Sequence, residues 1–260
     1  MTRVVTLTTD FGPGSVYVAE MKGVLLGAAP VALVDLCHDL APHDVRAAAW
    51  FVGRACPAFP PGAIHLVVVD PGVGTSRRLL HARIGDHDYL APDNGVLSLA
   101  IQRCGLARAR EIEVPAGAAA TFHGRDVLAP FAATLLRGAD PPAGPTIEPA
   151  LLDFPGPTTG DDGTVRGEVI HVDAFGNLVT NLSAALLPRL LAAGRILVGD
   201  RAVTRVVRTY GDAPPGSAVA LVGSQDALEV AVVEGRAGDR LVAGVGTPVT
   251  LPAPDSGAAG

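Results

Sequence analysis

Short runs of β-branched and other apolar residues alternate with alanine-rich helical patterns through the first half of the chain. This pattern predicts strands at 4–9, 31–36, 63–70 and 110–114, a hairpin that turns at Gly85 and Asp86, and helices at 16–29, 44–56, 96–104 and 127–136. The strand at 63–70 is apolar on both faces, as strands covered by helices on both sides are. The pattern therefore predicts an α/β domain over residues 1–140 with a central, largely parallel sheet.

The alternation changes after residues 141–163, which are rich in proline, glycine and aspartate and predict a linker. Seven short strand patterns follow within 164–252, with one helical interruption at 184–193. Many closely spaced short strands are typical of a small antiparallel sheet or barrel. The second half therefore predicts a smaller, all-β, barrel-like C-terminal domain, and 253–260 are expected to be a disordered tail.

Composition and charge narrow the possible functions. The three cysteines are widely spaced, lack zinc-ligand spacing and predict reduced thiols in a cytoplasmic protein. The formal net charge is −6 and no basic cluster occurs, which argues against nucleic acid or an anionic membrane as a partner. No signal-peptide pattern and no apolar run of about 18 residues is found, so neither secretion nor a membrane span is expected.

Acidic residues lie at the ends of three predicted strands, where open α/β sheets bind their ligands: Asp10, Asp35 with Asp39, and Asp70. Asp10 follows the first strand in TTDFGPGSVY, and a carboxylate there can accept hydrogen bonds from two neighbouring ribose hydroxyls. The alternative is that Asp10 forms a turn or begins a helix. The glycines of this loop match neither a P-loop nor an ordered dinucleotide fingerprint.

The segment VVVDPGVGTSRR carries Asp70 at the end of an apolar strand and Arg77 in the following loop. Glycines in this loop permit a tight return, which can bring the guanidinium to the carboxylate. The pair could be purely structural, but a partly desolvated carboxylate is usually retained for a functional site. His123 precedes a predicted helix in TFHGRDVL, so an acid, a guanidinium and an imidazole all lie on loops of one domain.

The second domain contributes a polar cluster in HVDAFGNLVTNL. Asp173, Phe175 and Asn177 offer an acid, a ring and an amide, which suit stacking on a heterocycle and hydrogen bonding to its edge. The alternative is an Asp-initiated turn with Gly176 at its tip. Ser224 lies in a predicted hairpin loop within LVGSQD and is unremarkable by itself.

Six segments occur together in one order: TTDFG, YVAEMKG, VDPGVGTSRR, APDNGVL, FHGRD and HVDAFGNLVTN. In this order and spacing the chain resembles the S-adenosyl-L-methionine (SAM) hydroxide adenosyltransferases, adenosine-forming SAM hydrolases related to fluorinase and chlorinase, over residues 4 to 250. The resemblance implies hydrolysis of SAM to adenosine and L-methionine by in-line attack of an activated water or hydroxide at ribose C5′. It also implies SAM as the small-molecule substrate, no cofactor, no metal, and a homotrimer with active sites between subunits.

The resemblance assigns roles to particular residues. The family's catalytic triad falls on Asp70, Arg77 and His123, and its ribose-binding acid falls on Asp10. Further substrate-binding positions are Ser15, Asp173, Phe175, Asn177 and Ser224. Ser15 stands where family members carry an acid, and Gln225 where some carry a basic residue, so recognition of the methionine end departs from the family pattern.

The chemistry suits these residues because a sulfonium leaves as a neutral thioether, which needs no acid catalyst. The enzyme must therefore make a water molecule nucleophilic, and either Asp70 or His123 could take the proton of that water.

The sequence leaves three alternatives open. A SAM-dependent halogenase is the nearest, but the halide-using relatives carry an aromatic residue at the position of Asp70 and lack the histidine of position 123. A metal-dependent phosphohydrolase could use Asp10, Asp39 and Asp70, and a non-catalytic nucleoside sensor could keep the pocket without turnover.

Overall fold

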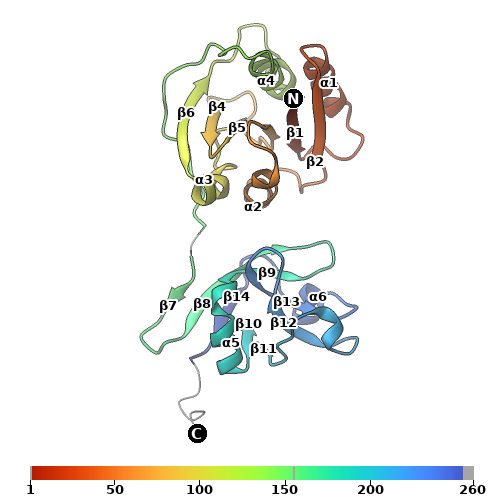
Figure 1. Ribbon diagram of the computed structural model, residues 1–260, viewed down its shortest axis with the longest axis vertical. Coiled ribbons are helices and arrows are strands. Elements are labelled where there is room, and N and C mark those ends of the chain that lie inside the picture. Colours follow the sequence, from red (N-terminus) through yellow and green to blue (C-terminus); the bar gives the residue numbers. More distant parts are fainter. Residues whose placement is uncertain (1, 155, 254–260) are drawn as a thin grey trace. The chain divides into compact units, whose positions relative to one another are not determined.

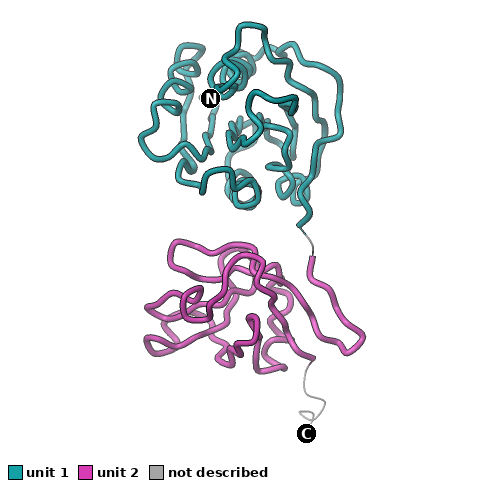
Figure 2. Tube along the Cα trace, turned by 180° about the vertical axis from the view of Figure 1, so that it is seen from behind, with its two compact units in different colours: residues 1–154 teal, residues 155–260 magenta. Residues whose placement is uncertain are grey.

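The computed structural model describes residues 2–154 and 156–253, and the chain divides between residues 154 and 155 into two compact units (Figures 1 and 2). We call them unit 1 and unit 2 in chain order. The greater part of the expected disordered tail, residues 254–260, lies outside the described residues. Within the described residues, no helix combines the length and the apolar character that crossing a bilayer requires.

Unit 1 is built on a six-stranded mixed sheet whose order is β2-β1-β3-β5-β4-β6. Its strands are β1 (Arg3–Thr9), β2 (Val31–Cys37), β3 (Ile64–Val68), β4 (Leu79–Ile84), β5 (His87–Pro92) and β6 (Leu106–Ile112). The adjacent strands β2, β1, β3 and β5 are parallel to one another. Strand β4 is antiparallel to both of its neighbours, β5 and β6. The sheet is thus parallel on one side of β5, and the β4–β5 hairpin makes the other side mixed.

Four α-helices cover this sheet. They are α1 (Val16–Leu26), α2 (Val45–Ala55), α3 (Ser98–Cys104) and α4 (Ala129–Leu136), with a short 3-10 turn η1 (Cys56–Ala58) after α2 and a π-helical turn η2 (Gly124–Leu128) before α4. The Ser15 side chain accepts from the Tyr17 amide at the start of α1, and Asp44 accepts from the Ala47 amide at the start of α2. These side chains satisfy backbone donors that the first turn of a helix leaves free.

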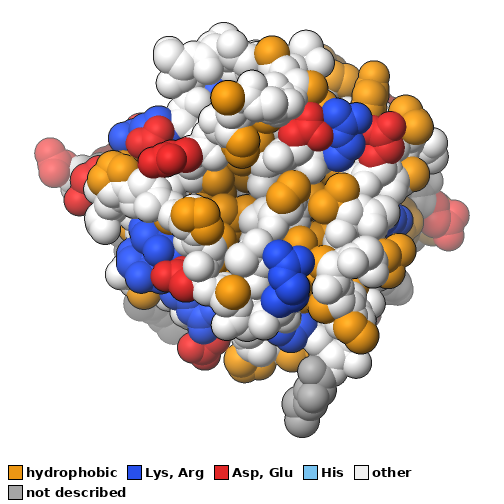
Figure 3. All heavy atoms as spheres, turned by 90° about the horizontal axis from the view of Figure 1, so that it is seen from above, with side chains coloured by type: hydrophobic (Ala, Val, Ile, Leu, Met, Phe, Trp, Pro, Cys, Tyr) orange, Lys and Arg blue, Asp and Glu red, His pale blue; other side chains and the backbone are white. Residues whose placement is uncertain are grey.

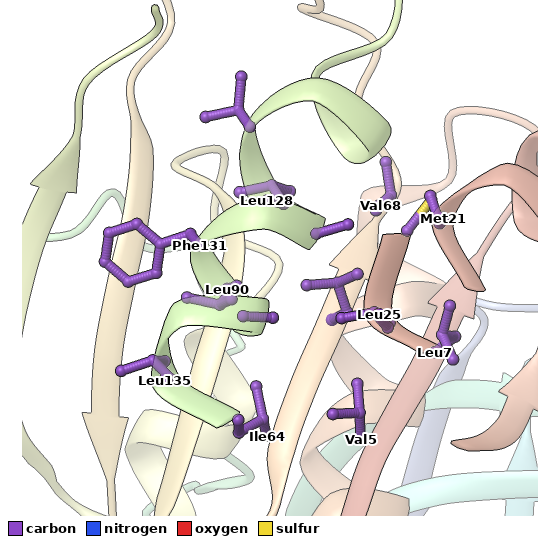
Figure 4. Close-up of a cluster of buried hydrophobic side chains, with 14 of the residues drawn as sticks. Val5, Leu7, Met21, Leu25, Ile64, Val68, Leu90, Leu128, Phe131 and Leu135 are labelled. Atoms are coloured by element: carbon purple, nitrogen blue, oxygen red, sulfur yellow. The ribbon is translucent and has the colours of Figure 1, made fainter. Parts of the chain in front are cut away.

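Separate hydrophobic clusters cover the two faces of the sheet. On one face, α1 and α4 pack over β1, β3 and β5, and Figure 4 shows Met21, Leu25 and Phe131 among the side chains of this layer. On the other face, α2 and α3 pack against Val67, Val69 and other side chains that alternate with the first set. Full burial of one such side chain contributes about 1.5–3 kcal/mol, so both layers hold the strand-end loops on a rigid base.

The segment expected to be a linker, 141–163, is partly built into the two units. Gly144 donates its amide to the Glu111 carbonyl, and Ile147 donates to Ala109, so this part of the chain pairs with the edge strand β6. Unit 1 continues to residue 154 for this reason, and β7 (Thr158–Thr159) pairs with the first long strand of unit 2. An edge strand offers unpaired backbone groups, and the proline-rich segment satisfies them here.

Unit 2 is an antiparallel sheet that curves toward closure. Besides β7, its strands are β8 (Val165–Val172), β9 (Leu178–Ser183), β10 (Ile196–Val198), β11 (Arg201–Val203), β12 (Ala218–Val222), β13 (Ala227–Val232) and β14 (Pro248–Leu251). They lie in the order β11-β10-β14-β8-β9-β13-β12, and a bridge from Val206 to Ala220 links the chain after β11 to β12 at the other end. The barrel-like architecture follows from this bridge.

Short helices interrupt the strands of unit 2. Helix α5 (Leu187–Ala193), preceded by the 3-10 turn η3 (Ala184–Leu186), lies in the predicted helical interruption. Helix α6 (Ala237–Leu241) and the 3-10 turn η4 (Tyr210–Asp212) were not expected. The all-β description therefore holds for the sheet but omits these turns, which are too short to show helical periodicity.

Candidate active site

The loop after β3 returns Arg77 to Asp70, as the spacing predicts. The Arg77 Nε lies 2.9 Å from Asp70 Oδ1, and Nη2 lies 2.5 Å from Oδ2. Only 8% of the Asp70 side chain and 10% of the Arg77 side chain are exposed. The guanidinium thus engages both carboxylate oxygens of Asp70 through charge-assisted hydrogen bonds, which are stronger than neutral ones.

Gly74 allows this loop to approach the loop that carries His123. Gly74 has φ +79°, and a Cβ atom there would lie 2.7 Å from the Ala120 carbonyl oxygen. A residue with a side chain would be strained by the φ angle and would push the two loops apart. The glycine therefore brings residues 70–77 against the segment just before His123.

His123 is buried and receives the second hydrogen of the same Arg77 nitrogen. Arg77 Nη2 donates to His123 Nδ1 at 2.7 Å. Burial, together with the positive charge of Arg77, lowers the pKa of His123, while Asp70 and Asp126 oppose this shift. Because a guanidinium has no acceptor, Nδ1 must be the unprotonated nitrogen, and the neutral imidazole carries its proton on Nε2.

The remaining polar residues of FHGRD stabilise the turn that holds the histidine. Asp126 accepts from the Ala119 amide at 2.9 Å and from Arg125 Nε at 2.6 Å. These bonds, that of Arg125 first, lower the pKa of Asp126 to about 2. The Arg125 guanidinium also pairs with Glu20 and stacks 4.8 Å above the Phe122 ring. Arg125 and Asp126 thus connect η2 to α1.

Asp10 and the triad acid and histidine line one cavity of about 230 Å³. Its walls are formed by Asp10, Phe11, Pro42, His43, Val68, Asp70, Val73, Thr121, Phe122, His123 and Gly124. Asp10 Oδ2 accepts from the backbone amide of His43 at 2.8 Å, and His43 has a positive φ of 66°. A non-glycine residue in this conformation is uncommon, and here it aims an N–H group at the carboxylate.

Ser15 has a structural role in this structure. Its hydroxyl caps α1, and it is not among the residues that line the cavity. The neighbouring aromatic side chains form a cluster, with the Phe11 and Tyr17 ring centroids 5.6 Å apart and those of Tyr17 and Phe122 5.1 Å apart. Phe11 and Phe122 therefore supply an apolar wall between the helix start and the cavity.

In unit 2, the predicted polar cluster forms a tight Asp-initiated turn between β8 and β9. Asp173 Oδ1 accepts from the amides of Phe175 and Asn177, each at 2.9 Å, and Oδ2 accepts from the Asn177 side-chain amide at 3.0 Å. Asn177 is buried, whereas 76% of Phe175 is exposed. The structural alternative is therefore realised, and it presents the Phe175 ring to the outside of unit 2.

Unit 2 holds a buried acid, Glu229, that the sequence pattern does not single out as a functional residue. Glu229 on β13 is buried, and Tyr210 Oη donates to its Oε1 at 2.6 Å. Burial raises the pKa of Glu229, the bond from Tyr210 lowers it, and the nearby charge of Asp173 raises it further. The sequence signal that could have revealed Glu229 is a single glutamate within the apolar run ALEVAVV.

Ser224, the predicted substrate-binding serine, lies exposed in the β12–β13 hairpin.

Three further observations concern metal binding and the distribution of charge. Over residues 2–154 and 156–253, no group of three or more His, Cys, Asp or Glu side chains is arranged to hold a metal ion. Asp39, one of the acids considered for such a site, accepts instead from the Cys37 thiol at 3.0 Å. Figure 3 shows basic and acidic side chains interspersed over the face drawn, with no large area of one sign.

In the α/β unit an acid after β3, a guanidinium in the following loop and an imidazole at the start of η2 come together, and an antiparallel, barrel-like unit follows in the chain. The SAM hydroxide adenosyltransferase N-terminal domain matches residues 5–143, and the C-terminal domain of the same family matches 167–250. The chain therefore belongs to the SAM hydroxide adenosyltransferase family.

Individual relatives agree with this assignment. The chain is 42% identical to a protein of Thermus thermophilus named (R)-S-adenosyl-L-methionine hydrolase, over 96% of this chain and 99% of that protein. A protein of the same name from Salinispora tropica is 39% identical over 91% and 93% of the two chains. A crystal structure of an uncharacterized conserved protein from Thermotoga maritima superposes with a TM-score of 0.86 at 35% identity, covering 95% of this chain and 98% of that one. Fluorinases are more distant, at 27% identity for that of an Actinoplanes species over 69% and 71% of the two chains.

Proposed function

We propose that this chain is an enzyme that hydrolyses SAM to adenosine and L-methionine. The observation that carries the proposal is the convergence of Asp70, Arg77 and His123 beside a cavity that Asp10 also lines. Family membership and the hydrolases at 39–42% identity support the same reaction. The fluorinases lie further away, so the hydroxide reaction is favoured over the halide reaction.

In the proposed reaction, a water oxygen attacks ribose C5′ in line with the bond from C5′ to the sulfonium sulfur. The C5′–O bond forms as the C5′–S bond breaks, and the bonding electron pair leaves with sulfur as the neutral thioether of methionine. The oxygen becomes the 5′-hydroxyl of adenosine, and one proton is released. Bulk water has a pKa of about 15.7, so the protein must stabilise the developing hydroxide.

The geometry supports Asp70 as the group that takes the proton. Arg77 occupies the Nδ1 lone pair of His123, so the neutral ring offers only an N–H group at Nε2. The Asp70 carboxylate still has lone pairs beyond those that Arg77 engages. In this scheme Asp70 removes the water proton, His123 donates from Nε2 to the developing hydroxide, and Arg77 holds both groups in place.

The substrate-binding roles follow from the same cavity. Asp10, oriented by the His43 amide, is proposed to accept from the two ribose hydroxyls and so fix C5′ before the triad. Such alignment can be worth roughly 7 kcal/mol or more in model systems. The aromatic wall of Phe11 and Phe122 would exclude competing water.

Other contacts to SAM are proposed from the family resemblance. Asp173, Phe175, Asn177 and Ser224 are proposed to contact the adenine and methionine parts, and Ser15 the methionine end, in a homotrimer with active sites between subunits. A cavity of about 230 Å³ is smaller than typical small-molecule sites of about 300–1,000 Å³, which supports a contribution from further groups. The three free thiols, Cys37, Cys56 and Cys104, support a cytoplasmic location.

The test is incubation of the purified protein with SAM, followed by chromatography of adenosine and methionine. We expect the two products in equal amounts, at a rate that a chelator leaves unchanged. Faster formation of a 5′-halogenated nucleoside with fluoride or chloride would instead assign a halogenase. Activity that is lost with a chelator and restored by magnesium would assign a metal-dependent enzyme, and binding of SAM without any product would assign a nucleoside sensor.

A further inference from the structure

Arg78, next to the triad arginine, forms a second ion pair, with Asp93. Its Nε lies 2.9 Å and its Nη2 2.6 Å from Asp93 Oδ2. Only 2% of the Asp93 side chain is exposed. Neither residue is among those that line the cavity beside the triad. Burying a polar group without partners is costly, so the hydrogen bonds that Asp93 accepts hold this part of the chain in a specific arrangement.

Asp93 and Asn94 together hold both ends of the triad loop. The Asp93 amide donates to the Arg78 carbonyl at 2.9 Å. The Asn94 side-chain amide donates to the Val69 carbonyl, also at 2.9 Å, directly before Asp70. The loop from 70 to 77 therefore begins and ends on two consecutive residues of the turn after β5.

The same carboxylate also holds the last segment of unit 1. Asp93 Oδ1 accepts from the Ala150 amide at 2.7 Å, and Arg78 Nη2 donates to the Glu148 carbonyl at 3.1 Å. At Gly95, which has φ +90°, a Cβ atom would lie 2.6 Å from Leu152 Cγ. Residues 148–152 are thus packed on the turn that anchors the triad loop, a few positions before unit 1 ends.

We propose that Arg78 and Asp93 are positioning residues that hold the Arg77 guanidinium between Asp70 and His123, and that they connect this loop to residues 148–152. The kinetic test of these positioning roles rests on the proposed function, whereas the titration test described below does not. A displacement of about 1 Å at a catalytic group can lower the rate about a hundredfold. An enzyme whose triad loop is held at one end only would therefore turn over SAM more slowly.

The primary variants are Arg78→Gln and Asp93→Asn, with Arg78→Lys as a milder change at a partly exposed site. Asp140→Asn is the matched control, because Asp140 pairs with Arg110 in the same unit at 2.6 Å but contacts no residue of the triad loop. Thermal unfolding and circular dichroism establish that each variant is folded. We expect kcat to fall at least about tenfold with KM for SAM within about twofold, while Asp140→Asn behaves as wild type.

A second readout does not depend on activity. His123 faces Arg77, Asp70 and Asp126, and the positive charge of Arg77 disfavours its protonated form. Loosening Arg77 should therefore move the His123 titration, followed by NMR of the unliganded protein, to higher pH in Arg78→Gln or Arg78→Lys. A merely structural role would leave this titration unchanged.

The kinetics and the His123 titration distinguish failure of the positioning role from failure of the proposed SAM hydrolysis. A fall in kcat together with a His123 titration at higher pH supports the positioning role. An unchanged titration in the folded variants overturns it, whatever happens to kcat. Absence of adenosine with the wild-type protein would contradict the proposed function, and the titration would still decide the positioning role.

Discussion

Arg77 Nη2 donates one hydrogen to Asp70 and the other to His123 Nδ1, 2.7 Å away. One nitrogen thus connects the acid at the end of β3 with the imidazole at the start of η2. Because the guanidinium can only donate, this contact determines which imidazole nitrogen carries the proton. His123 therefore presents an N–H donor at Nε2, and in the proposed reaction Asp70 is the acceptor for the proton of water.

The first prediction concerns His123→Gln and His123→Ala. Glutamine can place an amide donor near the position of Nε2, whereas alanine removes it. If His123 acts as a donor, the alanine variant should lose kcat by about 10²–10⁴-fold, and the glutamine variant should retain at least about tenfold more activity. Steady-state kinetics measure the difference. Equal loss in both variants would indicate that His123 acts as the base.

The pH profile tests the protonation state of the triad. Burial and Arg77 lower the pKa of His123 below its ordinary value of about 6.5, so the imidazole is neutral at neutral pH. Protonation of Nδ1 in acid would break the bond from Arg77. We therefore expect kcat/KM to be constant around neutrality and to fall only below about pH 6.5. A profile that rises on acidification through this range would contradict the neutral-histidine scheme.

Substitution of Asp70 should mainly lower turnover, and substitution of Asp10 should mainly weaken SAM binding. Asp70→Asn keeps the shape of the side chain but cannot take a proton, so kcat should fall by about 10²–10⁴-fold while SAM affinity changes little. Asp10→Asn retains one acceptor for the ribose hydroxyls, so the loss of one charge-assisted hydrogen bond should raise Kd at least about tenfold. Calorimetric binding and single-turnover kinetics measure both quantities. An equal loss of affinity in the two variants would favour structural roles for both acids.

A buried histidine far from the proposed chemistry should make the fold acid-sensitive. His65 on β3 is fully buried, with Nδ1 2.8 Å from Thr6 Oγ1, and burial, followed by the charge of His87, lowers the pKa of His65 to about 3. The unfolded chain therefore binds the proton first. Stability is complete above about pH 6.5 and falls toward pH 3, by up to about 1.4 kcal/mol per pH unit.

The measurement is urea unfolding of wild type and His65→Gln at about pH 7 and about pH 5. At about pH 5 a histidine of the unfolded chain is largely protonated, whereas the folded protein still keeps His65 neutral. His43→Asn is the control, because it removes an exposed imidazole and asparagine tolerates a positive φ. The free energy of unfolding should fall less on acidification in His65→Gln than in wild type or the control. The same pH dependence in all three proteins would contradict the prediction.

Local pattern predicted the parts of the structure that depend on neighbours in sequence. The strand that ends before Asp70, the return of Arg77 and the helix that follows His123 depend on apolar runs and glycines within a few positions. The structure adds detail that local pattern did not indicate at two places. Proline and glycine content indicated a linker where residues 144–147 pair with β6, and the short helix α6 has too few turns to show a period.

Contacts between distant segments were beyond the reach of local pattern. His43 orients Asp10 through a backbone amide, so its side-chain identity carries no trace of that role. Asp93 binds Arg78 and the Ala150 amide from separate parts of the chain, and Glu229 meets Tyr210 across unit 2. In each case the partner is decided by the packing of the fold.

The oxygen source of the product tests the central proposal most directly. The protein is incubated with SAM in oxygen-18-labelled water, and adenosine is analysed by mass spectrometry with fragmentation of the ribose. Attack of water at C5′ predicts that one labelled oxygen enters adenosine, at the 5′-hydroxyl, and that methionine stays unlabelled. Unlabelled adenosine, or a label in methionine, would contradict hydrolysis at C5′ by the Asp70, Arg77 and His123 site.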